Sequence, residues 1–475
     1  MSIRPPDRDH RVVNVLLALA TANLIAVMVT GGFSLPLGPY RIGLHSTSRS
    51  AAFVAVLAIW RVVWMRRGTS TKDDLIAWTK ANASHLTLGA IVLVALGLRF
   101  WGLNNGLPAM THSDEQDVVG HTIDMLKRSS LDPQWYHYPT AFMNLLLPSF
   151  AVYFVIGVGQ GLWHTLADVP ADAAGFYLVA RAHSALLGTA TVWFTYLLCR
   201  RAWPELKDAR AGLIAAVLVA VSFNSVRSSH EAVTDVPMTA VATLALVAIV
   251  AVCQRGLRRD YVAAGLLIGL ACSTKYSAAP LAGSLLIAHI WGRWPDRVWS
   301  MDAVLGFAAI PAGFFLGSPA ILFDWHIFLE HVGWLQSFAG AATPEQAAGR
   351  FFEMVSHALG VGFGWPGALL SAAAMAATLY RPRREHIILL AFVVLSLTAI
   401  THSTHRWFPR YLVPLYPAVY ALGAGLLVTV ADWVERRWTL RPIYVTLALV
   451  VATIIIAAPQ LQSALSYDYL ASSQP

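Results

Sequence analysis

Charged residues are scarce in this chain, and that scarcity decides its class. Asp, Glu, Lys and Arg together make up 13% of the 475 residues, whereas hydrophobic residues make up 57%. The mean hydropathy is +0.57, well above that of soluble globular domains. No stretch is polar enough to form a soluble domain. The composition therefore predicts an integral membrane protein with several spans.

Other absences narrow the function. The chain has only three cysteines, Cys199, Cys253 and Cys272, all within or at the ends of apolar segments, which argues against a disulfide framework or a zinc site. It has neither a phosphate-binding Gly-x-x-x-x-Gly-Lys-Ser/Thr motif nor a Gly-rich strand-to-helix unit, so a cytoplasmic nucleotide-sugar donor is not expected. The pI near 9.5 does not indicate nucleic acid binding, because the basic residues lie in short clusters between apolar segments.

Long apolar runs dominate what is present. A membrane-spanning helix needs about 20 apolar residues, and an all-α polytopic bundle of about 13 transmembrane helices is expected. The first run follows three arginines and has no cleavage site after it, so we expect it to remain as an anchor. The predicted spans are 12–30, 46–65, 86–103, 177–199, 211–228, 235–253, 261–274, 276–292, 301–321, 357–379, 387–401, 411–431 and 443–459.

Basic residues then predict the orientation. If the N-terminus is cytoplasmic and the apolar stretch 141–163 does not cross, most of the 34 Lys and Arg residues fall on the cytoplasmic side. If 141–163 crossed, every later basic loop would turn outward. We therefore expect 141–163 to be juxtamembrane or re-entrant, and Pro139 and Pro148 suit an interrupted helix. The expected location is a bacterial inner or plasma membrane.

Acidic side chains gather on the predicted outer side. Residues 111–117, Thr-His-Ser-Asp-Glu-Gln-Asp, place Asp114, Glu115 and Asp117 just past an apolar helix. Charge is costly near lipid, so such a cluster predicts a functional site. Further polar residues on the same side are His230, Glu231, Asp235, Arg406 and Arg410, and Lys275 joins two short apolar helices.

Several motifs resemble, in order, those of the GT-C superfamily of lipid-carrier-dependent glycosyltransferases, the class that contains protein O-mannosyltransferases and lipid A aminoarabinose transferases. The motifs lie at 99–108, 112–115, 131–139, 181–192, 229–237, 269–276 and 410–417. The resemblance implies an inverting enzyme that passes a sugar from a polyprenyl-phosphate carrier to a glycan, lipid or protein acceptor on the extracytoplasmic side.

The resemblance also implies a division of the chain. Residues 1–85 hold two N-terminal transmembrane helices and a cytoplasmic loop, which lie outside the family pattern. Residues 86–300 form a GT-C-like catalytic membrane module whose outer loop, 104–176, carries juxtamembrane helices. Residues 301–475 supply C-terminal transmembrane helices whose outer loops complete the donor site.

The chemistry demands a base and cations. A sugar on a polyprenyl phosphate already has a good leaving group, so the enzyme must deprotonate the acceptor hydroxyl and stabilise the departing phosphate. The family's outer-loop Asp corresponds to Asp114, which we predict to be the base; its alternative role is to cap a helix that starts near Ser113. Glu115 would orient the base or hold a metal, or else cap the same helix. Asp117 is expected to be a solvated first-turn residue.

The cationic half is predicted from later loops. Asp235 matches the family's second acidic residue, near the donor, although an Asp before Val-Pro is also an ordinary N-cap. Lys275 is expected to meet the lipid phosphate, with snorkelling to the interface as its alternative. Arg410, Tyr411 and Arg406 are predicted on the phosphate side, since Arg suits bidentate phosphate binding, or else form an interfacial anchor.

The sequence leaves open whether the site binds a divalent metal. Glu115, His230 and Glu231 are its candidate ligands, because imidazole with carboxylate suits zinc or manganese, although their spacing fits no standard motif. Two other functions compete: a polytopic transporter or lipid flippase, and an oligosaccharide polymerase or ligase of the cell envelope. Charges that converge at one outer cavity would favour the transferase, whereas charges along a path through the membrane would favour transport.

Overall fold

The computed structural model describes residues 33–37, 40–44, 79 and 81–473, apart from 108–111, 171–172, 207, 294–298, 341 and 404–407. The chain divides into two compact units, Met1–Leu86 and Thr87–Pro475. The predicted spans 12–30 and 46–65 lie outside the described residues. In the first unit, β1 (Phe33–Leu37) pairs antiparallel with β2 (Tyr40–Leu44). This hairpin was not predicted, although a Gly-Pro dipeptide between two apolar runs is a turn signal.

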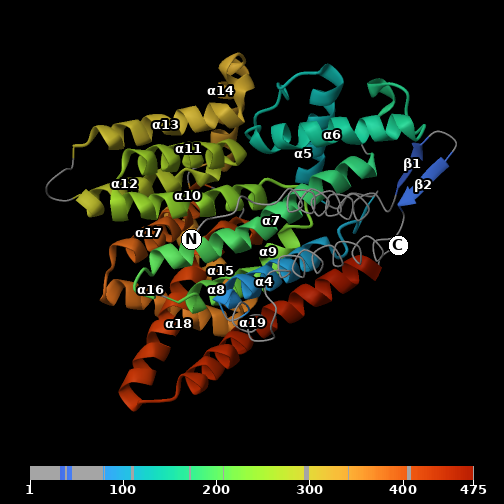
Figure 1. The fold of residues 1–475 in the computed structure, drawn as a ribbon. Helices are drawn as coiled ribbons and strands as arrows, with labels where there is room; N and C mark the ends of the chain where they lie inside the picture. Colours follow the sequence, from blue (N-terminus) through green and yellow to red (C-terminus); the bar gives the residue numbers. More distant parts are fainter. Residues whose placement is uncertain are drawn as a thin grey trace, which may run out of the picture. The chain divides into compact units, whose positions relative to one another are not determined.

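From α4 onward the described chain is helical (Figure 1). The helices are α4 (Ala83–Phe100), α5 (Ser113–Arg128), α6 (Ala141–Gly159), α7 (Ala174–Ala202), α8 (Arg210–Val221), α9 (Phe223–Ser228), α10 (Asp235–Arg255), α11 (Arg258–Thr274), α12 (Pro280–Arg293), α13 (Met301–Gly317), α14 (Trp325–Ala339), α15 (Pro344–His357), α16 (Gly364–Tyr380), α17 (Arg384–Ser403), α18 (Tyr416–Trp438) and α19 (Pro442–Ser473).

These helices confirm the predicted fold class, an all-α polytopic membrane bundle. Each predicted span from 86–103 onward coincides with a helix, and 211–228 is divided into α8 and α9. Among the described residues, six helices are long and apolar enough to cross a membrane by length and composition. The count of about 13 spans stays a prediction.

Small residues let the helices of the bundle approach closely. Along the contact of α11 with α13, a Cβ added at Gly265, Gly269 or Gly313 would collide with a backbone carbonyl of the facing helix. Such small-residue contacts are typical of helix pairs in membranes, where van der Waals packing replaces the hydrophobic effect. The pair α11 and α13 is therefore held by backbone proximity.

Helices α5 and α6 form a second, smaller core against the start of α7. Val118 and Ile123 of α5 pack with Phe142 and Phe150 of α6 and with Phe176 of α7. The opposite face of α6 exposes large apolar side chains, which suits contact with lipid; they are Leu145, Val152 and Val155.

The start of α6 lies against the end of α13. The backbone N–H of Thr140 donates to Ser318 Oγ over 2.9 Å, and Asn144 Nδ2 donates to the carbonyl of Gly317 over 2.9 Å. The helix runs unbroken through Pro148. The expected interruption at Pro148 is therefore wrong: residues 141–159 form one apolar helix, which starts where α13 ends.

The basic turns of the bundle meet at one end. Gln254, at the end of α10, donates to the carbonyl of Arg201 at the end of α7 and to Glu385 at the start of α17. Arg293, at the end of α12, donates to the carbonyl of Arg255 over 2.8 Å. Helices α5, α6 and α14 lie at the other ends of α11 and α13 (Figure 1).

The glycine contacts of α11 predict a stability effect. Gly269→Ala is expected to lower the free energy of unfolding by about 1–3 kcal/mol, because a methyl group must push α13 away. The matched control is Gly89→Ala on the exposed face of α4, where an added Cβ meets no atom within 4 Å. Thermal unfolding in detergent should rank Gly269→Ala well below wild type and Gly89→Ala at or slightly above it. Equal melting temperatures for the two variants would contradict the packing argument.

Candidate active site

Helix α5 begins so that its first acidic residue faces the bundle. His112 is the N-cap: its ring Nδ1 accepts the backbone N–H of Asp114 over 3.2 Å. The carboxylate of Asp114 is consequently not the cap of α5. It instead accepts from Arg410 Nη2 over 2.8 Å and from the hydroxyl of Tyr138 over 2.9 Å, both on Oδ2. Its other oxygen, Oδ1, accepts from the exposed hydroxyl of Ser113.

Four charged side chains form a continuous series, here called the charge chain: Asp114, Arg410, Asp235 and Lys275. Arg410 bonds Asp114 and places its Nε 3.5 Å from Asp235 Oδ2. Lys275 Nζ donates to Asp235 Oδ1 over 2.6 Å. Asp235 is 2% exposed at its side chain, and the other three are between 11% and 19% exposed. Two anions and two cations thus balance in a nearly buried cluster.

Helix ends position the charge chain. Asp235 is the first residue of α10, and the N-cap is Thr234, so the Asp235 carboxylate points to Lys275 instead of capping. Lys275 lies in extended backbone between the end of α11 and a short 3₁₀ turn. Arg410 lies in the 3₁₀ segment Pro409–Leu415 that leads into α18. Three elements far apart in sequence therefore bring their ends to one point.

Aromatic rings surround the two cations. Lys275 Nζ lies 4.9 Å from the ring centre of Tyr411 and 5.8 Å from that of Tyr138. The guanidinium of Arg410 lies 4.4 Å from the ring of Phe408. Such contacts stabilise desolvated cations. Arg406, which was predicted beside them, lies outside the described residues.

Opposing effects set the acidity of Asp114. Burial works to raise its pKa, but the charge of Arg410 and the hydrogen bond from Tyr138 outweigh it, so the pKa lies below its ordinary value. The pKa of Asp117 is instead raised, because its carboxyl group is partly buried and because the negative charge of Asp114 is nearby. Asp114 is therefore ionised in this arrangement.

Glu115 has a different environment from Asp114. It is fully buried and accepts a bidentate pair from Arg181 of α7, with Nε to Oε1 at 2.8 Å and Nη2 to Oε2 at 2.6 Å. The backbone N–H of Ala232 also donates to Oε1 over 2.6 Å. Arg181 in turn donates to the carbonyls of Leu103 and Asn105. Glu115 thus ties α5 to α7 and to the loop before α10.

The three predicted metal ligands do not fit a metal site. Glu115 forms an ion pair with Arg181. The two ring nitrogens of His230 are within hydrogen-bond distance of the backbone carbonyl oxygens of Val226 and Trp101. Glu231 faces His112, with Oε2 3.7 Å from Nε2, and burial raises the pKa of Glu231. Within the described residues, no group of three or more His, Cys, Asp or Glu side chains could hold a metal ion.

Sequence reasoning missed a second buried polar cluster beside the site. Asp468, near the end of α19, is fully buried, and its Oδ1 lies 3.5 Å from Nε2 of His230. The predicted helix 443–459 stopped before this residue. The guanidinium of Arg99 is also fully buried and donates to the carbonyls of Ala95, Val219 and Ala220. The available signal was an Arg inside an apolar helix, which requires partners.

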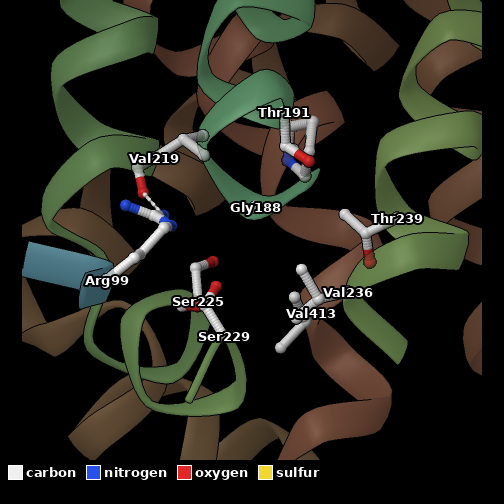
Figure 2. Close-up of a pocket in the computed structure, with 10 residues that line it drawn as sticks. Arg99, Gly188, Thr191, Val219, Ser225, Ser229, Val236, Thr239 and Val413 are labelled. Carbon is white, nitrogen blue, oxygen red and sulfur yellow. Dashed lines mark hydrogen bonds between the residues drawn. The ribbon is translucent and has the colours of Figure 1, made fainter. Parts of the chain in front are cut away.

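A small cavity adjoins Arg99. Figure 2 shows the guanidinium beside the carbonyl of Val219, with Ser225 and Ser229 on the same side of the space. The cavity has room for about one water molecule. It is too small for a sugar, so the charge chain, not this cavity, is the candidate active site.

The Glu115–Arg181 pair predicts a structural effect. Arg181→Met is expected to destabilise the protein by about 3–5 kcal/mol, because it leaves the Glu115 carboxylate buried without its partner. Adding Glu115→Gln to that variant should recover part of the loss, since the unpaired charge is removed. Thermal unfolding of the single and double variants measures both effects. A single variant as stable as wild type would show that the pair does not hold α5 to α7.

Comparisons with known proteins extend this description. A family model for dolichyl-phosphate-mannose-protein mannosyltransferase matches residues 176–322. That segment includes Arg181, Asp235 and Lys275. A comparison with curated protein sequences gave no match.

Similar solved structures include an oligosaccharyltransferase and ArnT. The oligosaccharyltransferase of Archaeoglobus fulgidus, tethered to an acceptor peptide with an NVT sequon, aligns with a TM-score of 0.54 and 16% identity over 83% of this chain and 56% of its own. The same enzyme with Zn and sulfate aligns at 0.50, with 16% identity over 81% of this chain and 53% of its own. ArnT from Cupriavidus metallidurans, bound to undecaprenyl phosphate, aligns at 0.52, with 17% identity over 82% of this chain and 76% of its own.

These alignments bear on the fold. The chain spans a little over half the length of the oligosaccharyltransferase and about three quarters of ArnT. The resemblance to GT-C enzymes expected from the sequence motifs is confirmed at this level. The chain has a fold similar to that of these two proteins, and residues 176–322 match the family model for dolichyl-phosphate-mannose-protein mannosyltransferase.

Proposed function

We propose that this protein is a GT-C glycosyltransferase that transfers a sugar from a polyprenyl-phosphate carrier to an acceptor at the extracytoplasmic face of the membrane. The observation that carries the proposal is the charge chain, which puts a carboxylate base beside two cations suited to a phosphate. The similar fold of ArnT, solved with undecaprenyl phosphate, supports a lipid-phosphate donor.

The arrangement of charge favours transfer over transport. Asp114, Asp235, Lys275 and Arg410 converge at one end of the bundle instead of lining a path through it. In a flippase or transporter, charged residues mark the substrate's path inside the membrane, and the binding site lies near the middle of the spans. An oligosaccharide polymerase or ligase would share the outer-face chemistry, and the family-model match over residues 176–322 favours transfer of a single sugar.

Lys275 and Arg410 are the proposed phosphate ligands. Each already contacts Asp235, so that carboxylate holds both cations in place before the donor arrives. Asp235 Oδ2 and Arg410 Nε are buried and face each other at 3.5 Å, and neither atom makes a hydrogen bond within the described part of the chain. An incoming phosphate would supply the missing acceptor for Arg410. Tyr411 lines the same position beside Lys275.

Asp114 is the proposed general base. The acceptor hydroxyl gives its proton to Asp114, the acceptor oxygen bonds to the anomeric carbon, and the bond from that carbon to the phosphate oxygen breaks. The leaving phosphate takes the electron pair, and Lys275 and Arg410 balance its second negative charge. When Arg410 turns to the phosphate, it weakens its hold on Asp114, which raises the pKa of the base at the moment it is needed.

The remaining predicted residues have supporting roles in this proposal. Glu115 fixes the first turn of α5 through Arg181 and does not touch the reacting atoms. His230 and Glu231 belong to the loop before α10. Glu115 contacts this loop at the backbone of Ala232, and His112 contacts it at Glu231. Because these side chains do not fit a metal, no step is assigned to one.

The site is proposed to face the extracytoplasmic side. The basic turns at the ends of α7, α10 and α12 meet at the opposite end of the bundle. Basic loops stay in the cytoplasm, so the charge chain, at the opposite end of the bundle, would face the extracytoplasmic side. In this orientation α6, although long and apolar enough to span a membrane, is proposed to be a juxtamembrane element of the first outer loop.

Replacing the base should abolish transfer without abolishing donor binding. Asp114→Asn is expected to lower transfer at least about 100-fold, since general base catalysis contributes roughly 10²–10⁴-fold. The measurements are mass spectrometry of envelope glycans in a complemented deletion strain and binding of polyprenyl phosphate to the purified variant. Asp117→Asn, one turn along α5, is the matched control and should keep most of the activity. Normal transfer by Asp114→Asn would refute the assignment.

The Tyr138 hydroxyl predicts a pH effect. Asp114 must be ionised to act. Because its pKa lies below the ordinary value for an aspartate, near 3.9, the carboxylate stays ionised at every pH above that value. Tyr138→Phe removes a donor that lowers this pKa, so the acidic limb of kcat/KM should move to higher pH, with little change near pH 8. The test is the initial transfer rate as a function of pH, measured in membranes of the deletion strain complemented with wild type or variant. Tyr136→Phe, which loses a bond to Asp132 instead, should leave the acidic limb in place.

A further inference from the structure

Four rings form a continuous array beside the active site. His121 of α5 stacks on Trp135 with ring centres 4.6 Å apart, and His137 stacks on Trp334 of α14 at 4.3 Å, each pair within 15° of parallel. Trp135 and His137 join the two stacks at 5.1 Å. We call these four residues the aromatic wall. Indole and imidazole alternate along it, from α5 through the loop 129–140 to α14.

The aromatic wall begins next to the proposed base. The ring of Tyr138 lies 5.6 Å from that of Trp135, and its hydroxyl donates to Asp114 over 2.9 Å. One side chain therefore separates the wall from the carboxylate that takes the acceptor's proton. Lys275 and Arg410 are assigned to the donor phosphate, so a group bound on the wall, next to the base, is assigned to the acceptor.

The loop that carries the wall is held rigidly. The backbone N–H of Tyr136 donates to Nδ1 of His331 on α14 over 2.9 Å. The hydroxyl of Tyr276 donates to the carbonyl of Tyr136 over 2.9 Å, and the hydroxyl of Tyr136 donates to Asp132 over 2.9 Å. These bonds connect the loop to α14 and to the turn after Lys275. A fixed surface of this kind loses little entropy when a ligand binds.

The chemistry of the aromatic wall matches a carbohydrate. A sugar ring presents C–H bonds on its faces and hydroxyls on its rim, and an indole offers an apolar face with a polar edge. Burial lowers the pKa of His121 and His137, so both imidazoles are neutral near pH 7, and each then has one donor and one acceptor for hydroxyls. Arg128, the cation near the wall, is occupied with the carbonyls of Asp124 and Asp132 at the end of α5.

We propose that the aromatic wall is the acceptor site and that the acceptor is a carbohydrate, so the enzyme attaches its sugar to another sugar of an envelope glycan. This inference rests on the proposed glycosyltransferase function. Trp334, with 47% of its surface exposed, is the member of the wall most open to a ligand. The role of Trp334 is to position the acceptor, not to act on reacting atoms.

Trp334→Ala provides the first test. In a deletion strain complemented at matched protein level, the variant should give at least tenfold less modified glycan, while the purified variant binds polyprenyl phosphate as wild type does. Trp325→Ala is the matched control, because Trp325 lies on the same helix at 49% exposure but contacts His326 instead of the wall. Unchanged modification by Trp334→Ala, or an equal loss in Trp325→Ala, would overturn the proposal.

The linkage in the product provides the second test. Mass spectrometry of envelope fractions from wild-type and deletion strains should find the missing sugar bonded to another sugar. A missing sugar that was bonded to a protein side chain or a lipid headgroup would overturn the acceptor proposal and leave the transferase standing. A deletion that removes no sugar, together with a purified protein that binds no polyprenyl phosphate, would overturn the proposed function itself.

Discussion

The pairing of Arg410 with both Asp114 and Asp235 is the constraint on which the site depends. An uncompensated charge beside lipid costs several kcal/mol, so each member of the charge chain must find its partner across helices. Those partners come from α5, α10, the α11 terminus and the segment before α18, and their pairing fixes four chain segments at one point. The same pairing keeps Asp114 ionised. The charge pairing that burial near lipid requires therefore also keeps the proposed base in its reactive, ionised form.

Two buried polar contacts behind the charge chain explain how its geometry is kept. Glu115 binds Arg181 of α7 and the backbone of Ala232, so the first turn of α5 and the loop before α10 cannot move independently. His230, in that loop, lies between the carbonyl of Trp101 and the carboxylate of Asp468. The helix turn that carries the base and the loop that leads to Asp235 are therefore both held by buried polar contacts. On the acceptor side, Tyr138 connects the base to the aromatic wall.

Sequence patterns predicted the helices and the residues of the charge chain, because apolar runs mark spans and charges near lipid stand out. They did not predict how the charges pair. Asp114 and Glu115 are adjacent, yet α5 turns one toward Arg410 and the other toward Arg181, 66 residues away. Asp468 was missed because it lies beyond the apolar part of α19, where hydropathy alone ends the helix. The unbroken α6 shows that a proline within a helix need not interrupt it.

The central claim is that a phosphate opens the charge chain and releases the base. An experimental structure of the protein with a polyprenyl phosphate bound tests it most directly. The account predicts phosphate oxygens within hydrogen-bond distance of Lys275 Nζ and of the Arg410 guanidinium, with the contact between Arg410 and Asp114 lengthened beyond a hydrogen bond. A phosphate bound elsewhere, or one bound while Arg410 keeps its 2.8 Å contact with Asp114, would contradict it.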